Sequence, residues 1–367
     1  KYNFKAMMWS DMFFRFIFGD YYSEGEIDPE LIKLVPTDVM LVYWDYYSTD
    51  EDKYDRLIKQ HQKFKNEIGF AGGAWKWSGI VPAINHSHNV SKMALNAAKK
   101  NGVSTVFTTA WGDNGAEASI YTILPTLVLH GEVSYSNENV DQKVSSKLCA
   151  LTGFSLSDFF MLCQPNKTPE NNLKPHFNPC KYLFFQDVLM GLFDYHVRDN
   201  FPKFFADCHK KLDILAQKNS NVSYVFDTIS KLCNVLELKC DIGVRLKKAY
   251  EQKNNDELNR LANEVIPEIL ARIEIYYSAF KKQWYNESKT GGFDIQDIRF
   301  GGLIRRIKTA QETVNNYISK KVDYIEELEQ PRLPFDCRKI DENDNRLQLL
   351  ELYCYTKCKR QILKKIY

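Results

Sequence analysis

The run DVMLVYWDYY, residues 38–47, is a short apolar stretch that reaches a tryptophan and then turns polar at once. A stretch of this length, rich in valine, leucine and aromatic residues, is typical of a buried parallel strand that opens into a loop. Three other runs have the same build: FKAMMWSD (residues 4–11), GFAGGAWKW (residues 69–77) and STVFTTAWGD (residues 104–113).

The tryptophans of these runs recur at near-even intervals, and they are Trp9, Trp44, Trp75 and Trp111. The interval suits a repeated unit of one strand and one helix. In a (β/α) barrel every strand brings its C-terminal end to the same face, so residues at the strand ends converge around one pocket. A ring of indoles at that face indicates a sugar-binding site.

Helical patterns separate the predicted strands. Residues 50–66 carry charges on one face and apolar residues at helical spacing on the other. Residues 90–101 have Lys99 and Lys100 near their end, and Gly102 follows as a helix stop. The alternation of strands and helices predicts an α/β domain over residues 1–130 that is about half of a (β/α)8 TIM barrel.

Carboxylates stand beside three of the tryptophans. An indole face stacks on the C–H face of a pyranose, and a neighbouring carboxylate accepts hydrogen bonds from its hydroxyls. A single tryptophan at a strand end is more often a packing residue, but the repetition favours sugar binding. The carboxylates are Asp11 after Trp9, Asp45 after Trp44, and Asp113 after Trp111.

The runs MMWSDMFFR, VYWDYY, AGGAWKWSG and TTAWGDNGAEAS, in that order, resemble the second half of the barrel of family 20 glycoside hydrolases. These are exo-acting β-N-acetylhexosaminidases, and the bacterial branch with a helical C-terminal extension is the most similar. By motif the resemblance covers roughly residues 1–130. It implies that the predicted strands are strands five to eight of the barrel.

The resemblance also implies roles for single residues. Trp9 would line the pocket for the N-acetyl group. Tyr43, the catalytic residue of this chain, would donate a hydrogen bond to the acetamido carbonyl, and Asp45, two positions on, would accept from sugar hydroxyls. Trp111 would form the floor under the sugar, and Asp113 would bind the C4 or C6 hydroxyl, where the family commonly has Glu.

The remaining candidates for substrate binding are Asp11, Trp75 and Trp77, which stand at or near strand ends. His86 and His88 follow in the expected loop after the third strand of this chain, where loop or helix-capping roles are favoured over metal binding. The resemblance implies that neither a metal nor a cofactor is needed.

The family mechanism is substrate-assisted retention, in which the 2-acetamido oxygen attacks the anomeric carbon. An adjacent Asp-Glu pair does the proton work. The acidic pairs in this chain fall in helical, charged segments, where solvated positions are favoured. The sequence begins at Lys1 without an initiator Met, so we expect the pair in a missing N-terminal half of the same enzyme. The alternative is a catalytically silent carbohydrate-binding protein.

Composition limits the other function classes. The net charge of +2 gives no case for nucleic acid, and no apolar stretch approaches the length of a membrane span. Nine cysteines without a Cys-x-x-Cys pair are interpreted as free thiols in a reducing, cytoplasmic setting, including Cys354 and Cys358. An N-acetylhexosamine-terminated glycan is the expected partner, and a homodimer is possible.

From about residue 131 the periodicity becomes helical, which predicts an α-helical domain over residues 131–367. The segment FDIQDIRFGG, with Asp294, Asp297 and Arg299, is expected as a charged loop between helices. The predicted helices cover residues 142–151, 184–193, 201–218, 222–238, 241–253, 255–280, 304–329 and 345–366.

Overall fold

The computed structural model describes residues 4–77, 79–136, 138–168, 178–341 and 343. The chain divides into two compact units that interleave along the sequence. Unit 1 contains Lys1–Lys76, Ala83–Trp111 and Thr122–Phe159, and unit 2 contains Trp77–Pro82, Gly112–Tyr121 and Phe160–Tyr367. The sequence predicts one domain boundary at residue 130, and this boundary stays a prediction. The compact units of the structure change at other points, one of which lies between Tyr121 and Thr122.

The sheet of unit 1 is parallel, with the strand order β1-β2-β3-β4. Each strand coincides with one of the four predicted runs, so the small parallel sheet is confirmed. The strands are β1 (Met7–Trp9), β2 (Met40–Trp44), β3 (Ile68–Gly73) and β4 (Thr105–Thr109).

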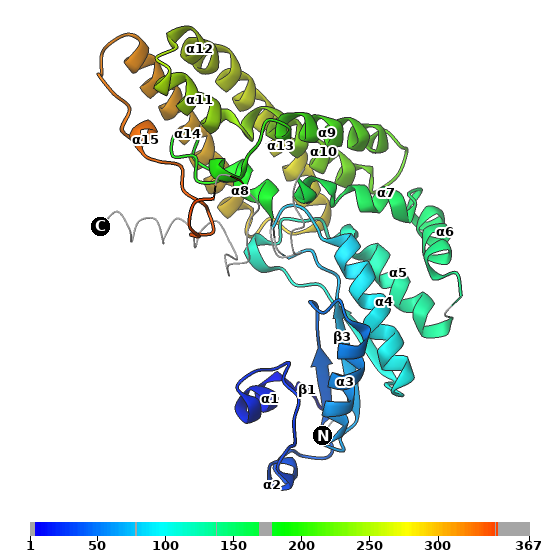
Figure 1. Cartoon of the computed structure of the whole chain (residues 1–367). Helices are drawn as coiled ribbons and strands as arrows, with labels where there is room; N and C mark the ends of the chain where they lie inside the picture. Colours follow the sequence, from blue (N-terminus) through cyan, green and yellow to red (C-terminus); the bar gives the residue numbers. More distant parts are fainter. Residues whose placement is uncertain (1–3, 78, 137, 169–177, 342, 344–367) are drawn as a thin grey trace. The chain divides into compact units, whose positions relative to one another are not determined.

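The core of unit 1 lies on one face of this sheet. Leu41, Tyr43, Ile68 and Phe70, which alternate along two neighbouring strands, pack there among helical residues. In Figure 1 the helices α3, α4 and α5 run alongside the strands. The helices of this unit are α1 (Asp11–Phe18), α2 (Pro29–Lys33), α3 (Glu51–Gln62), α4 (Ile84–Lys100), α5 (Leu124–Tyr135) and α6 (Val140–Thr152), while α7 (Leu156–Met161) spans the division between the units.

Unit 2 is built from helices, of which α10 packs against α9 and α13. A single π turn at Leu261–Val265 joins α12 to α13, so the predicted helix over residues 255–280 is continuous. In the described part of the chain no helix is both long and apolar enough to cross a membrane. The helices are α8 (Pro179–Phe185), α9 (Phe201–Ala216), α10 (Ser223–Lys239), α11 (Ile242–Glu251), α12 (Asn255–Arg260), α13 (Ile266–Glu287), α14 (Phe293–Ile318) and α15 (Glu326–Glu329).

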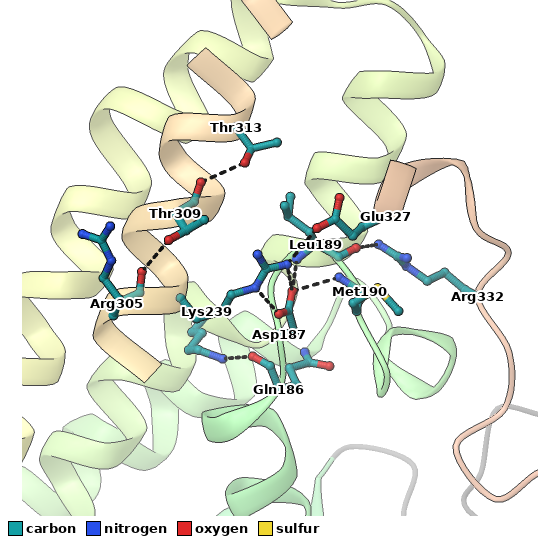
Figure 2. Close-up of polar contacts among 11 residues, drawn as sticks. Gln186, Asp187, Leu189, Met190, Lys239, Arg305, Thr309, Thr313, Glu327 and Arg332 are labelled. Atoms are coloured by element: carbon teal, nitrogen blue, oxygen red, sulfur yellow. Dashed lines mark hydrogen bonds and ion pairs between the residues drawn. The ribbon is translucent and has the colours of Figure 1, made fainter. Parts of the chain in front are cut away.

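Two helix predictions are wrong. The helix expected over residues 184–193 ends at Phe185, because the Asp187 carboxylate accepts hydrogen bonds from the backbone N–H groups of Leu189 and Met190 and closes a turn (Figure 2). The helix expected over residues 304–329 ends at Ile318, and a separate short helix follows.

The segment FDIQDIRFGG was expected to be a charged loop. It is helical instead and forms the first turns of α14, which begins at Phe293. Phe293 and Phe300 are buried and stack on Phe280 of α13. This packing outweighs the cost of about 1 kcal/mol for each glycine inside a helix, here Gly301 and Gly302. The helix predicted over residues 345–366, with Cys354 and Cys358, lies outside the described residues.

Candidate functional site

Aromatic rings gather at the C-terminal ends of the strands in unit 1. The ring of Trp9 lies 6.0 Å from that of Phe107 and 6.3 Å from that of Trp111, centroid to centroid. Trp9 is 39% exposed and Trp111 is 42% exposed. Two indoles in contact that both remain open to solvent form a surface on which a flat apolar ligand face can stack. We name the set the aromatic cluster: Trp9, Trp44, Tyr46, Tyr47, Trp75, Phe107 and Trp111.

The register of the sheet explains how rings from its two edge strands meet. Trp9 of β1 stands in one row with Val42 and Gly69, and Phe107 of β4 stands in the next row with Ala71. These positions share the face opposite the Tyr43 core because side chains alternate along each strand. Trp44 of β2 stands in the same row as Ala71 and Phe107, so it shares this face with Trp9.

Tyr46 links the two halves of the cluster. Its hydroxyl oxygen accepts a hydrogen bond of 3.2 Å from the indole N–H of Trp111, and its ring packs on Trp44 at 5.2 Å. Burial raises the pKa of the Tyr46 phenol, while hydrogen bonds with Thr109 and Trp111 lower it. A phenol is protonated at neutral pH with or without this shift, and its contacts with Thr109 and Trp111 hold the hydroxyl in place.

Trp75 closes the far end of the cluster and is itself buried. Its ring meets Tyr47 edge-on at 5.2 Å and His86 at 5.4 Å. Its backbone N–H donates to the hydroxyl of Ser87, which fixes the chain after β3. Trp75 therefore packs against Tyr47 from the buried side of the cluster. Trp77 is also buried but belongs to unit 2.

Tyr43 and Asp45 were expected to contact a bound sugar. In the structure both side chains lie in the interior of unit 1. The Tyr43 hydroxyl donates to Asp45 at 3.0 Å, and both side chains are closed to solvent. Asp45 also accepts from the backbone N–H groups of Tyr47 and Ser48, at 2.8 and 3.0 Å. Burial raises its pKa against the effect of these bonds. Tyr43 faces the core because strand alternation gives the opposite face to its neighbour Trp44.

The two remaining carboxylates lie at the start of short elements. Asp11 opens α1 two positions after Trp9 and is partly exposed, with a long contact of 3.9 Å to Arg15. Asp113 is exposed, at the first position of a 3-10 turn, Asp113–Gly115, and belongs to unit 2. The structure therefore brings Asp11, but not Asp45, to an open position beside the aromatic cluster.

His86 and His88 were expected in a loop, and this prediction is wrong because both lie in the first turns of α4. His86 donates through Nε2 to the backbone oxygen of Tyr46 at 2.7 Å. His88 contacts the carboxylate of Asp141 at 2.8 Å. His86 thus holds the backbone of the residue whose hydroxyl contacts Trp111.

Tyr46, Tyr47 and Phe107 are members of the cluster that the motif comparison did not single out. The signal was present in the sequence, since Tyr46 and Tyr47 follow directly on Trp44-Asp45. Residues just past a strand leave the pleat and can turn toward either face. The aromatic pair after the strand end was therefore a better pointer to this surface than Tyr43 within the strand.

A second polar centre lies within unit 2, around the buried carboxylate of Glu117. One of its oxygens lies 2.7 Å from Nζ of Lys181, and the other lies 2.9 Å from a guanidinium nitrogen of Arg299. Lys181 also donates to the backbone oxygen of Asn114, and Gln283 donates to that of Glu117. Helices α8, α13 and α14 therefore hold the segment after Asp113 at several points.

A third polar network fastens the turn that follows α8 in unit 2. Arg306 of α14 pairs with both Asp187 and Glu327. Lys239, which is fully buried, donates to the backbone oxygen of Leu183 at 2.8 Å. It also donates to the backbone oxygen of Gln186 at 2.9 Å (Figure 2). Burial lowers the pKa of Lys239 to about 7. The network ties helix ends together within the described part of unit 2.

Comparison with family models matches residues 157–347 to the Glycoside Hydrolase 20C C-terminal domain. A search of curated proteins found no match. The matched residues begin in α7 and include the helices that surround Glu117 and Lys239. Because the match covers more than half of the sequence, the chain belongs to the family 20 glycoside hydrolases.

Proposed function

We propose that this chain forms part of a β-N-acetylhexosaminidase that removes terminal N-acetylhexosamine from glycans by the substrate-assisted, retaining mechanism. The observation that carries the proposal is the pair of open indoles, Trp9 and Trp111, at the C-terminal ends of parallel strands in a chain of this family. In the proposal these indoles stack on the sugar and its acetyl group. Asp11 accepts hydrogen bonds from sugar hydroxyls, and Asp113 takes the role that the resemblance implies.

Two tyrosines compete for the bond to the acetamido carbonyl. The motif spacing favours Tyr43, whose hydroxyl is engaged by Asp45 in the interior. The contacts favour Tyr46, whose hydroxyl is shared with the open indole of Trp111. We propose Tyr46 for this role. A donor that is held in place before the reaction stabilises the charge that develops on the attacking carbonyl.

We also propose that the sheet is strands five to eight of a (β/α)8 barrel. The parallel order of the four strands and the aromatic residues at their C-terminal ends support this assignment. β1 is an edge strand whose residues Met7 and Met8 are 47% and 40% exposed. An exposed apolar edge strand is a surface that another strand can cover by pairing. In the proposal this partner carries the orienting Asp and the general-acid Glu.

Binding of sugar to the chain tests the first proposal. Titration with N-acetylglucosamine and N-acetylgalactosamine, followed by isothermal calorimetry, should give saturable binding by at least one of them. Glucose, which lacks the acetamido group, should bind at least tenfold more weakly. Trp9→Ala should abolish the binding, whereas Trp284→Ala, in unit 2, should preserve it. Equal affinity for glucose would contradict an acetamido pocket.

Hydrolysis separates the enzyme from a silent carbohydrate-binding protein. An aryl N-acetyl-β-hexosaminide should not be hydrolysed by residues 1–367 alone, and should be hydrolysed when the chain is co-expressed with a polypeptide that supplies the first four barrel strands. Sugar binding without hydrolysis in the co-expressed complex would favour the silent protein. Rapid turnover by the chain alone would mean that one of its own carboxylates is the acid.

A further inference from the structure

A chain of buried hydrogen bonds lies behind the aromatic cluster in unit 1. Ser10, Tyr21 and His61 are all closed to solvent. Oγ of Ser10 lies 2.7 Å from Nε2 of His61 and 3.3 Å from the hydroxyl of Tyr21. The Tyr21 hydroxyl in turn lies 2.9 Å from the backbone nitrogen of Trp44. Nδ1 of His61 ends the chain at the backbone oxygen of Leu57, at 2.7 Å.

The chemistry of the groups gives this chain a direction. A carbonyl oxygen only accepts, so Nδ1 of His61 carries the proton toward Leu57, and Nε2 of the neutral ring is the acceptor. Burial lowers the pKa of His61 to about 4, which keeps the ring neutral at pH 7. The single Ser10 hydroxyl proton therefore lies between two acceptors, Nε2 of His61 and the backbone oxygen of Val42. Tyr21 donates to Ser10, and the Trp44 N–H donates to Tyr21.

Serine next to histidine is also the arrangement of a nucleophile and its base, but the geometry points elsewhere. A nucleophile needs access to a substrate carbonyl, and Ser10 is fully buried. Its Oγ also lies 2.9 Å from the backbone oxygen of Val42, a second acceptor inside the sheet. The partners of the Ser10 hydroxyl, which are Tyr21, Val42 and His61, are therefore all groups of the protein interior.

This chain of hydrogen bonds meets the aromatic cluster at two points, Ser10 and Tyr21. Ser10 follows Trp9 directly, and it also donates its backbone N–H to Val42 of the neighbouring strand. Tyr21 holds the backbone nitrogen of Trp44 and packs its ring on that indole at 5.0 Å. The strand ends that carry Trp9 and Trp44 are therefore joined through Ser10 and Tyr21, with His61 of α3 as the anchor.

We propose that Ser10, Tyr21 and His61 are positioning residues, which set the two strand ends so that Trp9 and Trp44 present their indoles to the sugar. This inference rests on the proposed function, since it assigns the geometry of that same site. The three residues do not touch the sugar. Their effect on binding passes through the backbone at residues 9–10 and through the backbone and ring of Trp44.

The test uses the full chain and two measurements. Tyr21→Phe removes the acceptor of the Trp44 N–H, so amide hydrogen exchange at Trp44 should become at least tenfold faster. Tyr54→Phe removes another buried hydroxyl of the same core, one that donates to Ser48, and should leave exchange at Trp44 unchanged. Unchanged amide exchange at Trp44 in Tyr21→Phe would contradict the hydrogen bond from Trp44 to Tyr21 and so overturn the proposed chain of hydrogen bonds. This outcome does not depend on whether the protein binds sugar.

The second measurement is affinity for the N-acetylhexosamine that wild-type protein binds. Ser10→Ala and His61→Gln should each weaken it about tenfold. His130→Gln should not, although His130 is also a buried histidine of unit 1. Circular dichroism and a cooperative unfolding transition establish that each variant is folded. Wild-type affinity in folded Ser10→Ala and Tyr21→Phe would overturn the positioning role. Failure of wild-type protein to bind any N-acetylhexosamine would instead overturn the proposed function.

Discussion

The indole nitrogen of Trp111 donates a hydrogen bond to the Tyr46 hydroxyl, although the two residues are 65 positions apart in the sequence. The bond joins the residue past the end of β4 to the loop that follows β2. The orientation of the exposed Trp111 ring therefore depends on a hydroxyl from the loop after β2, a strand that is not the neighbour of β4 in the sheet. A substitution at either partner should alter the surface of the aromatic cluster without removing a strand.

Trp111→Phe should keep an aromatic ring but release the Tyr46 hydroxyl. We expect about 0.5–1.5 kcal/mol lower stability, as for a typical hydrogen bond, and a weaker affinity for N-acetylhexosamine. The control is Trp284→Phe, which also removes an indole donor, to the backbone oxygen of Lys289. It should lower stability by a similar amount and leave sugar affinity intact. Equal affinities of the two variants would exclude a role for Trp111 in binding.

Kinetics should separate Tyr46 from Tyr43. In the active complex, Tyr46→Phe should reduce kcat by an amount equivalent to about 2–4 kcal/mol, the range for loss of a preorganised donor, with little change in KM. Tyr43→Phe should act mainly on stability, because its hydroxyl bonds to Asp45 inside the core. The reverse result, with the large kcat loss in Tyr43→Phe, would restore the assignment based on spacing.

The four strands could be predicted because each apolar run ends abruptly in a tryptophan and a polar residue. The face that each side chain occupies could not, since a shift of one residue in the strand reverses the assignment. Tyr43 and Trp44 are adjacent in the sequence and lie on opposite faces. The spacing Tyr43-x-Asp45 matched a motif, but only the register of β2 showed that this tyrosine points into the core.

The contacts around Glu117 could not be predicted for a different reason. Glu117 and Lys181 are separated by 64 positions, and no local periodicity links them. The segment FDIQDIRFGG was predicted as a charged loop from Asp294, Asp297 and Arg299, while the aromatic packing of Phe300 depends on a neighbouring helix. Local patterns therefore gave the elements, whereas long-range pairing decided how the segment after Asp113 is held.

Acid should destabilise unit 1 through its buried histidines. Burial lowers the pKa of His61 and of His130 from 6.5 to about 4. As the pH falls below 6.5, the unfolded state takes up protons first, so stability is full above that pH and declines until about pH 4. Each histidine contributes up to about 3 kcal/mol to this loss.

Urea unfolding of unit 1 at pH 7.5, 5.5 and 4.5 measures this effect. His61→Gln and His130→Gln should each decline less steeply with falling pH than the wild type, and the double variant should decline least. An unchanged pH dependence in the double variant would mean that other groups cause the acid sensitivity.

The ion pairs of Glu117 should be strongly coupled, because two of their three charged groups are buried. Glu117→Ala leaves the ammonium of Lys181 buried without its carboxylate, and Lys181→Ala leaves the carboxylate with Arg299 alone. Each single variant should lose about 3–5 kcal/mol of stability, the range for breaking a buried pair. The double variant should lose clearly less than the two losses added together, since neither charge is left buried without its partner.

Urea unfolding of the wild type, the two single variants and the double variant gives the coupling energy. The matched surface pair, Lys203 with Asp207 on α9, is exposed and should show almost no coupling in the same cycle. Additive losses at Glu117 and Lys181 would mean that the two charges are solvated independently and that the segment after Asp113 is held by its other contacts.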